Sequence, residues 1–192
     1  MSQFLQQRLY LAGPDIFLPE AAAIAAQKKA LCRHYGFIGL HPLDAEQPML
    51  PTPGATVMAI YRSNMALMAA ADAVVANLTP FRGPSADAGT VFELGWMLGR
   101  GKPAFGYSLA ADLFRERSVA ARPGARFDAA SGRWFDADGM EIEDFGLRDN
   151  LMIDCALQDG SYPLFTPVAG AATLAGFEAC LRAARAHFDR PV

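Results

Sequence analysis

The sequence lacks any apolar run that is long enough to cross a membrane. A helical span needs about 18 or more apolar residues in a row, and no stretch of the 192-residue chain approaches that length. The N-terminal segment carries only a short apolar run after Arg8, which is too short for a secretory signal. We therefore expect a protein that makes no contact with a membrane.

Cysteine and histidine are also scarce, with three residues of each. They are Cys32, Cys155, Cys180, His34, His41 and His187. Because the cysteines are odd in number and form no CxxC pair, they predict reduced thiols in a cytoplasmic protein rather than a disulfide framework. The histidines show no metal-ligand spacing, so we expect no metal site.

The chain has no strong excess of either charge. Its 17 basic and 20 acidic residues give a net charge of −3, so it lacks the basic surface that nucleic-acid-binding proteins need. The densest basic group is Arg115, Arg117, Arg122 and Arg126, which we interpret as part of a solvated face. With 52% apolar residues, the chain is long enough to form one well-packed domain over residues 1–192.

The pattern that is present alternates short apolar strands with amphipathic helices. Strands are predicted at 8–13, 37–42, 73–78, 104–108 and 163–167, and helices at 19–36, 55–71, around Glu93, 149–157 and 173–188. This alternation predicts an α/β fold, a flavodoxin-like three-layer sandwich with a five-stranded parallel sheet. Residues 112–148 interrupt the alternation, and their two turn signals (Ser131-Gly132 and Asp138-Gly139) predict a hairpin-like excursion that forms a flap over the site.

The stretch from 82 to 103, RGPSADAGTVFELGWMLGRGKP, runs from a polar loop into a helix. A strand–loop–helix–strand order places this loop at the carboxyl edge of a parallel sheet, where open α/β folds bind ligands. Glu93 then has two interpretations. It either forms a capping box with Thr90, or it is an ionised carboxylate near the positive end of a helix, suited to attack a sugar carbon. Spacing alone does not separate the two.

Four other polar residues are candidates with equally plain structural roles. Asp87 can be a loop residue or a helix N-cap, and six residues of helix turn through about 600°, so it meets Glu93 only if it folds back. Tyr10 lies near the carboxyl end of the first strand, where its ring can pack or its hydroxyl can reach the site. Asn64 is expected to face solvent, and Asn150 is a natural helix-start residue.

Three segments resemble the nucleoside 2-deoxyribosyltransferases, in their usual order. They are YLAGPDIF (10–17), ADAVVANLTPFRGPSADAGTVFELG (71–95) and EDFGLRDNLMID (143–154). The central segment is long and specific, and with the α/β pattern the resemblance spans nearly the whole chain. It implies an enzyme without a cofactor that acts on 2′-deoxynucleosides and free nucleobases.

The resemblance also implies a mechanism and three catalytic residues. Glu93 matches the nucleophilic glutamate of the family, and Asp87 matches the aspartate that handles the proton of the base. Tyr10 matches the tyrosine that positions the nucleophile. The carboxylate forms a covalent deoxyribosyl intermediate, a second base attacks it, and the two displacements retain configuration.

Five further residues are substrate-binding candidates by the same resemblance. Asn150 matches an asparagine that a neighbouring subunit offers to the sugar hydroxyls, which implies a homo-oligomer. Asn64 occupies a site position that is aspartate in some members, so it bears on which base is recognised. Gly13, Phe17 and Gly89 belong to the matching segments and complete the set.

Two other functions stay open. The segment 88–93, AGTVFE, also resembles the GTxxE core of phosphoribohydrolases, which cleave the base from nucleoside 5′-monophosphates. The two glycines that precede this core are replaced by Asp87 and Ala88, although Arg82 could meet a phosphate. A related deoxynucleotide N-hydrolase is also possible. The last alternative is a non-catalytic nucleotide-binding or flavin-binding module, but the loop at 82–90 is neither a GxGxxG motif nor a P-loop.

Overall fold

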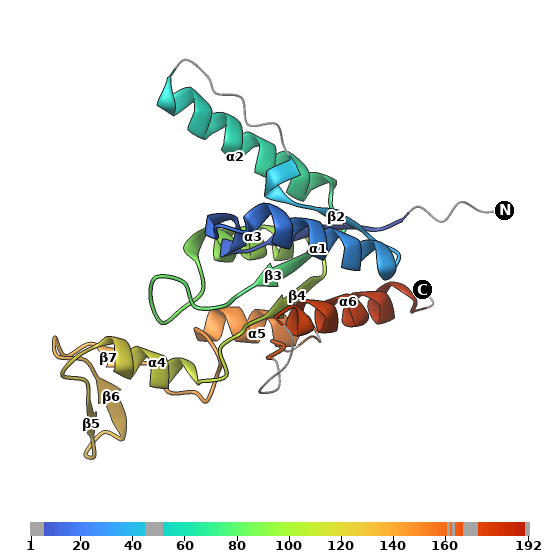
Figure 1. Ribbon diagram of the computed structural model, residues 1–192. Coiled ribbons are helices and arrows are strands. Elements are labelled where there is room, and N and C mark those ends of the chain that lie inside the picture. Colours follow the sequence, from blue (N-terminus) through green and yellow to red (C-terminus); the bar gives the residue numbers. More distant parts are fainter. Residues whose placement is uncertain (1–5, 45–51, 161, 163, 167–172, 191–192) are drawn as a thin grey trace.

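A parallel sheet forms the centre of the molecule (Figure 1). The computed structural model describes residues 6–44, 52–160, 162, 164–166 and 173–190. Four strands, paired in the order β2-β1-β3-β4, make up the sheet: β1 (Arg8–Ala12), β2 (Ile38–Leu40), β3 (Ala73–Asn77) and β4 (Ala104–Tyr107). This is the beginning of the flavodoxin-like order, so the prediction of a parallel sheet is confirmed.

The fifth strand predicted at 163–167 is reduced to a single bridge in the residues described there, 164–166. Phe165 makes one isolated parallel bridge to Tyr107, through hydrogen bonds with Gly106 and Ser108. Residues 163 and 167 lie outside the described residues, and both are prolines, which cannot donate a hydrogen bond to a neighbouring strand. Among the described residues, the sheet therefore has four strands and a single bridge at its edge.

Helices cover both faces of the sheet. One face is covered by α1 (Ala21–His34) and α6 (Ala175–Phe188), and the other by α2 (Pro53–Ala70), α3 (Ala88–Leu98) and α5 (Leu151–Asp159). Successive strand residues serve opposite cores: Leu9 and Leu11 pack with α1 and α6, whereas Tyr10 packs with the other three helices. The three-layer arrangement was predicted from the alternation of elements.

The helix α2 extends beyond the sheet (Figure 1). Within it, Met68 is the buried residue. The Lys102 ammonium group donates to the carbonyls of Met68, Ala69 and Ala71 at 2.9, 2.9 and 2.5 Å. The last carbonyls of a helix lack the full set of intrahelical partners, and a cation there also interacts favourably with the negative end of the helix dipole. Lys102 thus fixes the end of α2 that joins the sheet.

The excursion differs from the prediction in two respects. It begins with a helix, α4 (Phe114–Ala121), that was not predicted, and a small antiparallel sheet follows, formed by β5 (Arg126–Asp128), β6 (Arg133–Phe135) and β7 (Glu141–Ile142). Both predicted turns are present, with Gly132 and Gly139 at positive φ. The small sheet lies beyond α4 and not over the central sheet (Figure 1), and its role as a flap over the site stays a prediction.

Candidate active site

Two short 3₁₀ turns and the loop before α3 surround the carboxyl edge of the sheet. The turn η1 (Pro14–Phe17) follows β1, and η2 (Pro42–Asp44) follows β2. At this edge the Tyr10 hydroxyl donates a hydrogen bond of 2.6 Å to Oε1 of Glu93. Tyr10 is fully buried in β1, and α3 packs on the sheet through Leu94 and Met97. The fold therefore holds the Glu93 carboxylate against a fixed donor.

The surroundings of this pair change the acidity of both groups. Burial raises the pKa of Glu93 to about 7, the hydrogen bond from Tyr10 opposes this shift, and the nearby charge of Asp87 adds to it. Burial and the Glu93 charge raise the pKa of Tyr10 well above its ordinary value, so the phenol stays a donor. A poorly solvated carboxylate with one firm hydrogen bond is a reactive nucleophile once it is ionised.

The start of α3 rules out the capping box between Thr90 and Glu93. The N-cap residue is Asp87, whose Oδ2 accepts hydrogen bonds from the Thr90 amide and hydroxyl at 2.9 and 3.0 Å. Thr90 is therefore inside the helix, and Glu93 lies beyond its first turn. The capping role belongs to Asp87, and the side chain of Glu93 is turned to Tyr10 instead. Asp87 is also close enough for its charge to act on Glu93.

The two candidate glycines lie where a side chain would crowd the site. A Cβ atom at Gly13 would lie 2.8 Å from Cβ of Asn77 and 2.7 Å from Oδ2 of Asp15. At Gly89 it would lie 3.1 Å from Oδ2 of Asp87. Glycine thus permits the close approach of β1 to β3 at Gly13 and leaves the Asp87 carboxylate unobstructed at Gly89.

An aromatic pair lies between the loops that follow β1 and β3. The rings of Phe17 and Phe81 are stacked with centroids 5.3 Å apart, and Phe17 is 55% exposed. The Arg82 guanidinium lies 4.7 Å from the Phe81 centroid and 5.4 Å from that of Phe17. Phe17 was predicted from the sequence and Phe81 was not, although an aromatic residue shortly after a strand is a signal for such a position. Together the rings offer a flat face suited to a nucleobase.

Asn64 is not joined to these groups. It is partly buried on α2, and no hydrogen bond or ion pair within the described ranges links it to Tyr10, Asp87 or Glu93. The expectation that it faces solvent is thus only partly met. A role of Asn64 in base recognition stays a prediction.

Asn150 begins α5, as its residue type suggested. Its Oδ1 accepts from the amide of Met152 at 3.0 Å, and its Nδ2 donates to Oε1 of Glu143 at 2.5 Å. Both ends of the side chain amide are therefore bound within the same chain. Asn150 also lines the cavity between α3 and α5, to which neither Tyr10 nor Glu93 contributes.

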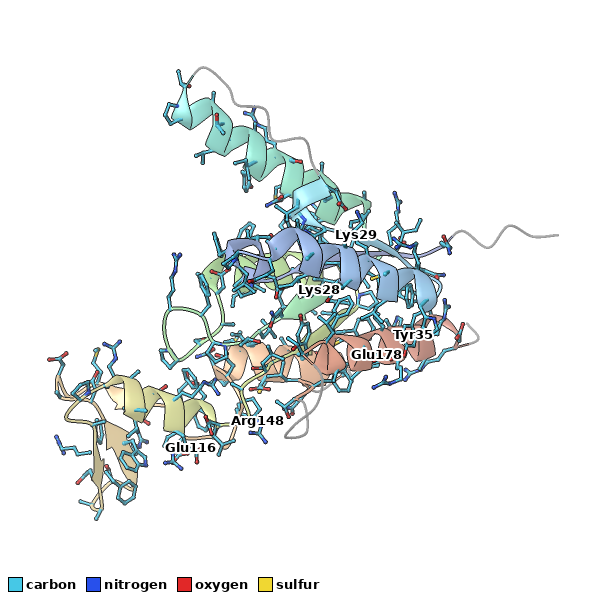
Figure 2. All side chains as sticks on the ribbon, viewed as in Figure 1. Lys28, Lys29, Tyr35, Glu116, Arg148 and Glu178 are labelled. Carbon is cyan, nitrogen blue, oxygen red and sulfur yellow. The ribbon has the colours of Figure 1, made fainter. Side chains whose placement is uncertain are left out.

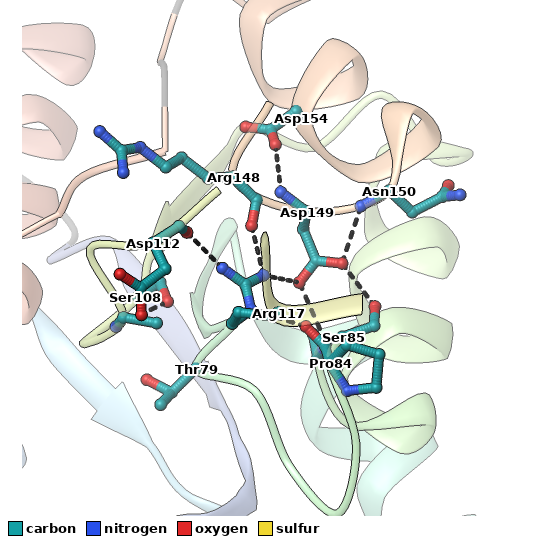
Figure 3. Close-up of polar contacts among 12 residues, drawn as sticks. Thr79, Pro84, Ser85, Ser108, Asp112, Arg117, Arg148, Asp149, Asn150 and Asp154 are labelled. Carbon is teal, nitrogen blue, oxygen red and sulfur yellow. Dashed lines mark hydrogen bonds and ion pairs between the residues drawn. The ribbon is translucent and has the colours of Figure 1, made fainter. Parts of the chain in front are cut away.

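Arg117 ties the excursion to the loop that leads to Asp87 (Figure 3). Its guanidinium donates to the carbonyl oxygens of Pro84, Asp112 and Arg148 at 2.8, 2.5 and 2.5 Å. The side chain is 12% exposed. Arg117 does not lie on a solvated face, as the sequence analysis had suggested, but closes a buried junction.

Asp149 completes this junction from the other side (Figure 3). Its fully buried carboxylate accepts from the Ser85 hydroxyl and, at 3.0 Å, from the amide of Ala86, and it lies 3.8 Å from the Arg117 guanidinium. Because Ser85 and Ala86 directly precede Asp87, the start of α5 fixes the backbone that enters α3. The position of Asp87 therefore depends on a segment more than 60 residues away.

We expect Arg117→Met to destabilise the protein strongly. The change leaves three carbonyl oxygens and the Asp149 carboxylate without their cation, so the free energy of unfolding should fall by about 2–4 kcal/mol. Urea denaturation measures this difference. Arg133→Met removes the exposed ion pair with Glu141 and should cost less than about 0.5 kcal/mol. Equal losses in the two variants would contradict the structural role of Arg117.

A cavity of about 690 Å³ lies between α3 and α5. Its lining is mainly apolar, with the Ser85 and Asn150 side chains among the polar contributors; the apolar residues include Val91, Leu98 and Ile153. Met152 also lines it and is 72% exposed. Neither Tyr10 nor Glu93 is among the lining residues, so this apolar surface is separate from the carboxylate pair.

The thiols take no part in the site described above. All three cysteines are free, Cys32 and Cys180 being buried and Cys155 exposed. Burial raises the pKa of Cys32 to about 12, so this thiol is protonated at neutral pH. Within the described residues, no three His, Cys, Asp or Glu side chains come together where they could hold a metal ion. No helix in the same part of the chain is long and apolar enough to span a bilayer.

Known proteins resemble this chain in structure and in sequence. The solved structure of a 2-desoxiribosyltransferase from Leishmania mexicana is 26% identical, covers 92% of this chain and 97% of its own, and has a TM-score of 0.64. A conserved protein from Enterococcus faecalis V583 shares the fold at 16% identity and a TM-score of 0.51, covering 94% of this chain and 99% of its own. An uncharacterized protein of Schizosaccharomyces pombe is 32% identical over 157 residues, 76% of this chain and 74% of the relative. The family model described as nucleoside 2-deoxyribosyltransferase matches residues 9–152. This match confirms the resemblance seen in the sequence, and the chain belongs to the nucleoside 2-deoxyribosyltransferase family.

Proposed function

We propose that the protein transfers the 2-deoxyribosyl group of a 2′-deoxynucleoside from one nucleobase to another, with Glu93 as the nucleophile. The observation that carries this proposal is the short hydrogen bond between Tyr10 and Glu93 at the carboxyl edge of the sheet. The pKa of Glu93, about 7, leaves a large fraction ionised at neutral pH while keeping the carboxylate basic. Membership of the family supports the substrate class.

The reaction takes place in two displacements at C1′ of the sugar. In the first, a Glu93 carboxylate oxygen bonds to C1′ as the bond from C1′ to the base nitrogen breaks, and Asp87 delivers a proton to the departing base. In the second, the nitrogen of a new base bonds to C1′, the ester bond to Glu93 breaks, and Asp87 takes up the proton of the new base. Two inversions give retention of configuration.

Each of the remaining groups has a part in this scheme. Tyr10 holds Oε1 of Glu93, which leaves the second carboxylate oxygen, Oε2, to attack. The Phe17–Phe81 pair offers its exposed face to the base. Asn64 is a candidate for reading the edge of the base, and Gly13 and Gly89 keep side chains away from Asn77 and Asp87.

A second copy of the chain is part of the proposal. The apolar cavity between α3 and α5, with the exposed Met152 at its surface, offers a surface for a partner subunit to cover. Asn150 lies at the same place and would be presented to the site of the neighbouring subunit. The free thiols fit a cytoplasmic location.

One incubation tests the proposed reaction. A 2′-deoxynucleoside is mixed with a different free base, and chromatography is used to look for the exchanged nucleoside. With a slow substrate and no second base, mass spectrometry should find a deoxyribosyl adduct on the peptide that contains Glu93. If no base is released and no adduct forms, the chain does not carry out this reaction.

A hydrolase for nucleoside 5′-monophosphates is the second candidate, and one observation favours it. The Arg82 side chain is exposed beside the aromatic pair, where its positive charge could meet a phosphate. Parallel incubations with a deoxynucleoside and with its 5′-monophosphate separate the two functions. Faster base release from the monophosphate, without exchange, would replace the transferase proposal.

The raised pKa of Glu93 predicts how stability depends on pH. Between its ordinary value of 4.5 and about 7, the folded state keeps a proton that the unfolded state has released, so this group makes stability fall as pH rises through that window. Glu93→Gln still offers an oxygen to Tyr10 but does not titrate. Its unfolding free energy relative to the wild type should therefore rise by up to about 3 kcal/mol from pH 4.5 to 7 and stay level above pH 7. Urea denaturation at several pH values measures the difference, and parallel stability curves would contradict it.

A further inference from the structure

Asp15 and Lys28 form a buried ion pair behind the site. The Lys28 ammonium group on α1 donates to Oδ2 of Asp15 at 2.5 Å, and the Lys28 side chain is 3% exposed. Figure 2 labels Lys28 at the centre of the molecule, beside its neighbour Lys29. Burial lowers the pKa of Lys28, and the charge of Asp15 works against this effect. A pair buried to this extent is weak evidence for stability, because desolvation offsets its attraction.

The pair continues into hydrogen bonds that cross the carboxyl edge of the sheet. Oδ1 of Asp15 accepts from Nδ2 of Asn77 at 2.9 Å. Oδ1 of Asn77 accepts from the amide and the hydroxyl of Thr79 at 3.1 and 2.5 Å. The Thr79 hydroxyl in turn accepts from the amide of Leu109 at 3.0 Å. We call the side chains of Lys28, Asp15, Asn77 and Thr79 the edge network.

The edge network joins the two segments that carry the aromatic pair. Asp15 belongs to η1, which ends at Phe17. Thr79 lies two residues before Phe81, and Leu109 adds the segment after β4. None of these bonds involves Tyr10 or Glu93, so the network acts on the aromatic pair and not on the nucleophile.

We infer that the edge network positions the Phe17–Phe81 face, and through it the base that captures the Glu93-bound sugar. This inference rests on the function proposed above. Lys28 holds the Asp15 carboxylate in place. Asp15 and Asn77 set the distance between the two segments, and Thr79 fixes the approach to Phe81. All four are positioning residues, because they contact one another rather than the reacting atoms.

A loosened network alters the fate of the covalent intermediate. When the base is poorly seated, water attacks C1′ in its place. The ester bond to Glu93 breaks, Asp87 accepts the proton of the water, and free 2-deoxyribose leaves. The first displacement is changed less, because the departing base is still bonded to the sugar and the Tyr10–Glu93 pair is intact. The ratio of free deoxyribose to exchanged nucleoside therefore reports on the network.

Thr79→Val is the variant of choice because it keeps the side-chain shape and removes only the two hydroxyl hydrogen bonds. We expect it to raise the ratio of hydrolysis to transfer by at least about threefold, with a higher KM for the acceptor base and less than about a twofold change in the first release of base. The matched control is Ser131→Ala, which removes another 2.5 Å hydroxyl hydrogen bond, to Asp128 in the excursion. The control should keep the wild-type ratio. Because the ratio is set in each turnover, a smaller folded fraction does not change it.

Amide hydrogen exchange provides a readout without any substrate. The amides of Leu18 and Phe81 are hydrogen-bonded within the two segments, and their exchange should become about fivefold faster in Thr79→Val, while that of Val75 in β3 is unchanged. The inference is wrong if the wild-type protein transfers deoxyribose between bases and Thr79→Val gives the same ratio of hydrolysis to transfer as the wild type. If the wild type releases no base, the proposed function fails instead. In that case, unchanged amide hydrogen-exchange rates at Leu18 and Phe81 in Thr79→Val would show that the edge network does not position these two segments.

Discussion

Replacing Glu93 by alanine is expected to lower base exchange by at least about 10³-fold, the loss typical of removing a catalytic nucleophile. The structural reason is that no other carboxylate shares the position of Glu93 opposite the Tyr10 hydroxyl in the described part of the chain. The rate of exchange is followed by chromatography, and no adduct should form on the peptide that spans residue 93. The fold should survive, because Leu94 and Met97, rather than Glu93, make the apolar contacts between α3 and the sheet.

Two companion variants separate the roles of the groups around Glu93. Glu93→Gln keeps an acceptor for Tyr10 but cannot form the ester, so it should be as inactive as the alanine variant. Asp87→Asn retains an oxygen that can cap α3 but cannot deliver a proton, so weak activity should remain. A fully active Glu93→Ala protein would leave Glu93 with a structural role alone.

The alternation of strands and helices predicted the layers of the fold because each face of a parallel sheet must be covered. The buried run from Ala73 to Asn77 could only be a central strand, and it is. The same reasoning was not enough for the fifth strand, around Phe165. This segment is apolar, but it includes two prolines, which cannot donate hydrogen bonds to a neighbouring strand. The helix α4 was missed because its sequence, FRERSVAA, is short and only half apolar, and because it is held by tertiary contacts such as those of Arg117.

The contacts of the site were harder to predict from the sequence, because they join residues that are far apart along the chain. The defining contact joins Tyr10 to Glu93 across 83 residues, and local spacing does not contain it. The local pattern also fitted a capping box at Thr90, and only the structure shows that Asp87 is the N-cap residue instead. The edge network shows the same limit, because Asp15 and Asn77 meet only when β1 and β3 pair in the folded sheet.

Mixing two inactive variants should restore activity if the site is shared between subunits. One variant is Glu93→Ala and the other is Asn150→Ser, which keeps a hydroxyl able to cap α5 but loses the reach of the amide. In a dimer with two crossed sites, random exchange of equal amounts gives mixed dimers in half of the population, each with one complete site. Activity should therefore return to about a quarter of the wild-type value.

The structure supports this prediction and also offers an alternative role for Asn150. Asn150 and the exposed Met152 both line the apolar cavity between α3 and α5, where a second subunit could pack. The alternative is that Asn150 serves only its own chain, through Glu143 and the amide of Met152. In that case Asn150→Ser is active alone, since its cap is preserved. If both variants are inactive alone, mixed dimers are demonstrated with differently tagged subunits and activity still does not return, each subunit must hold its own complete site.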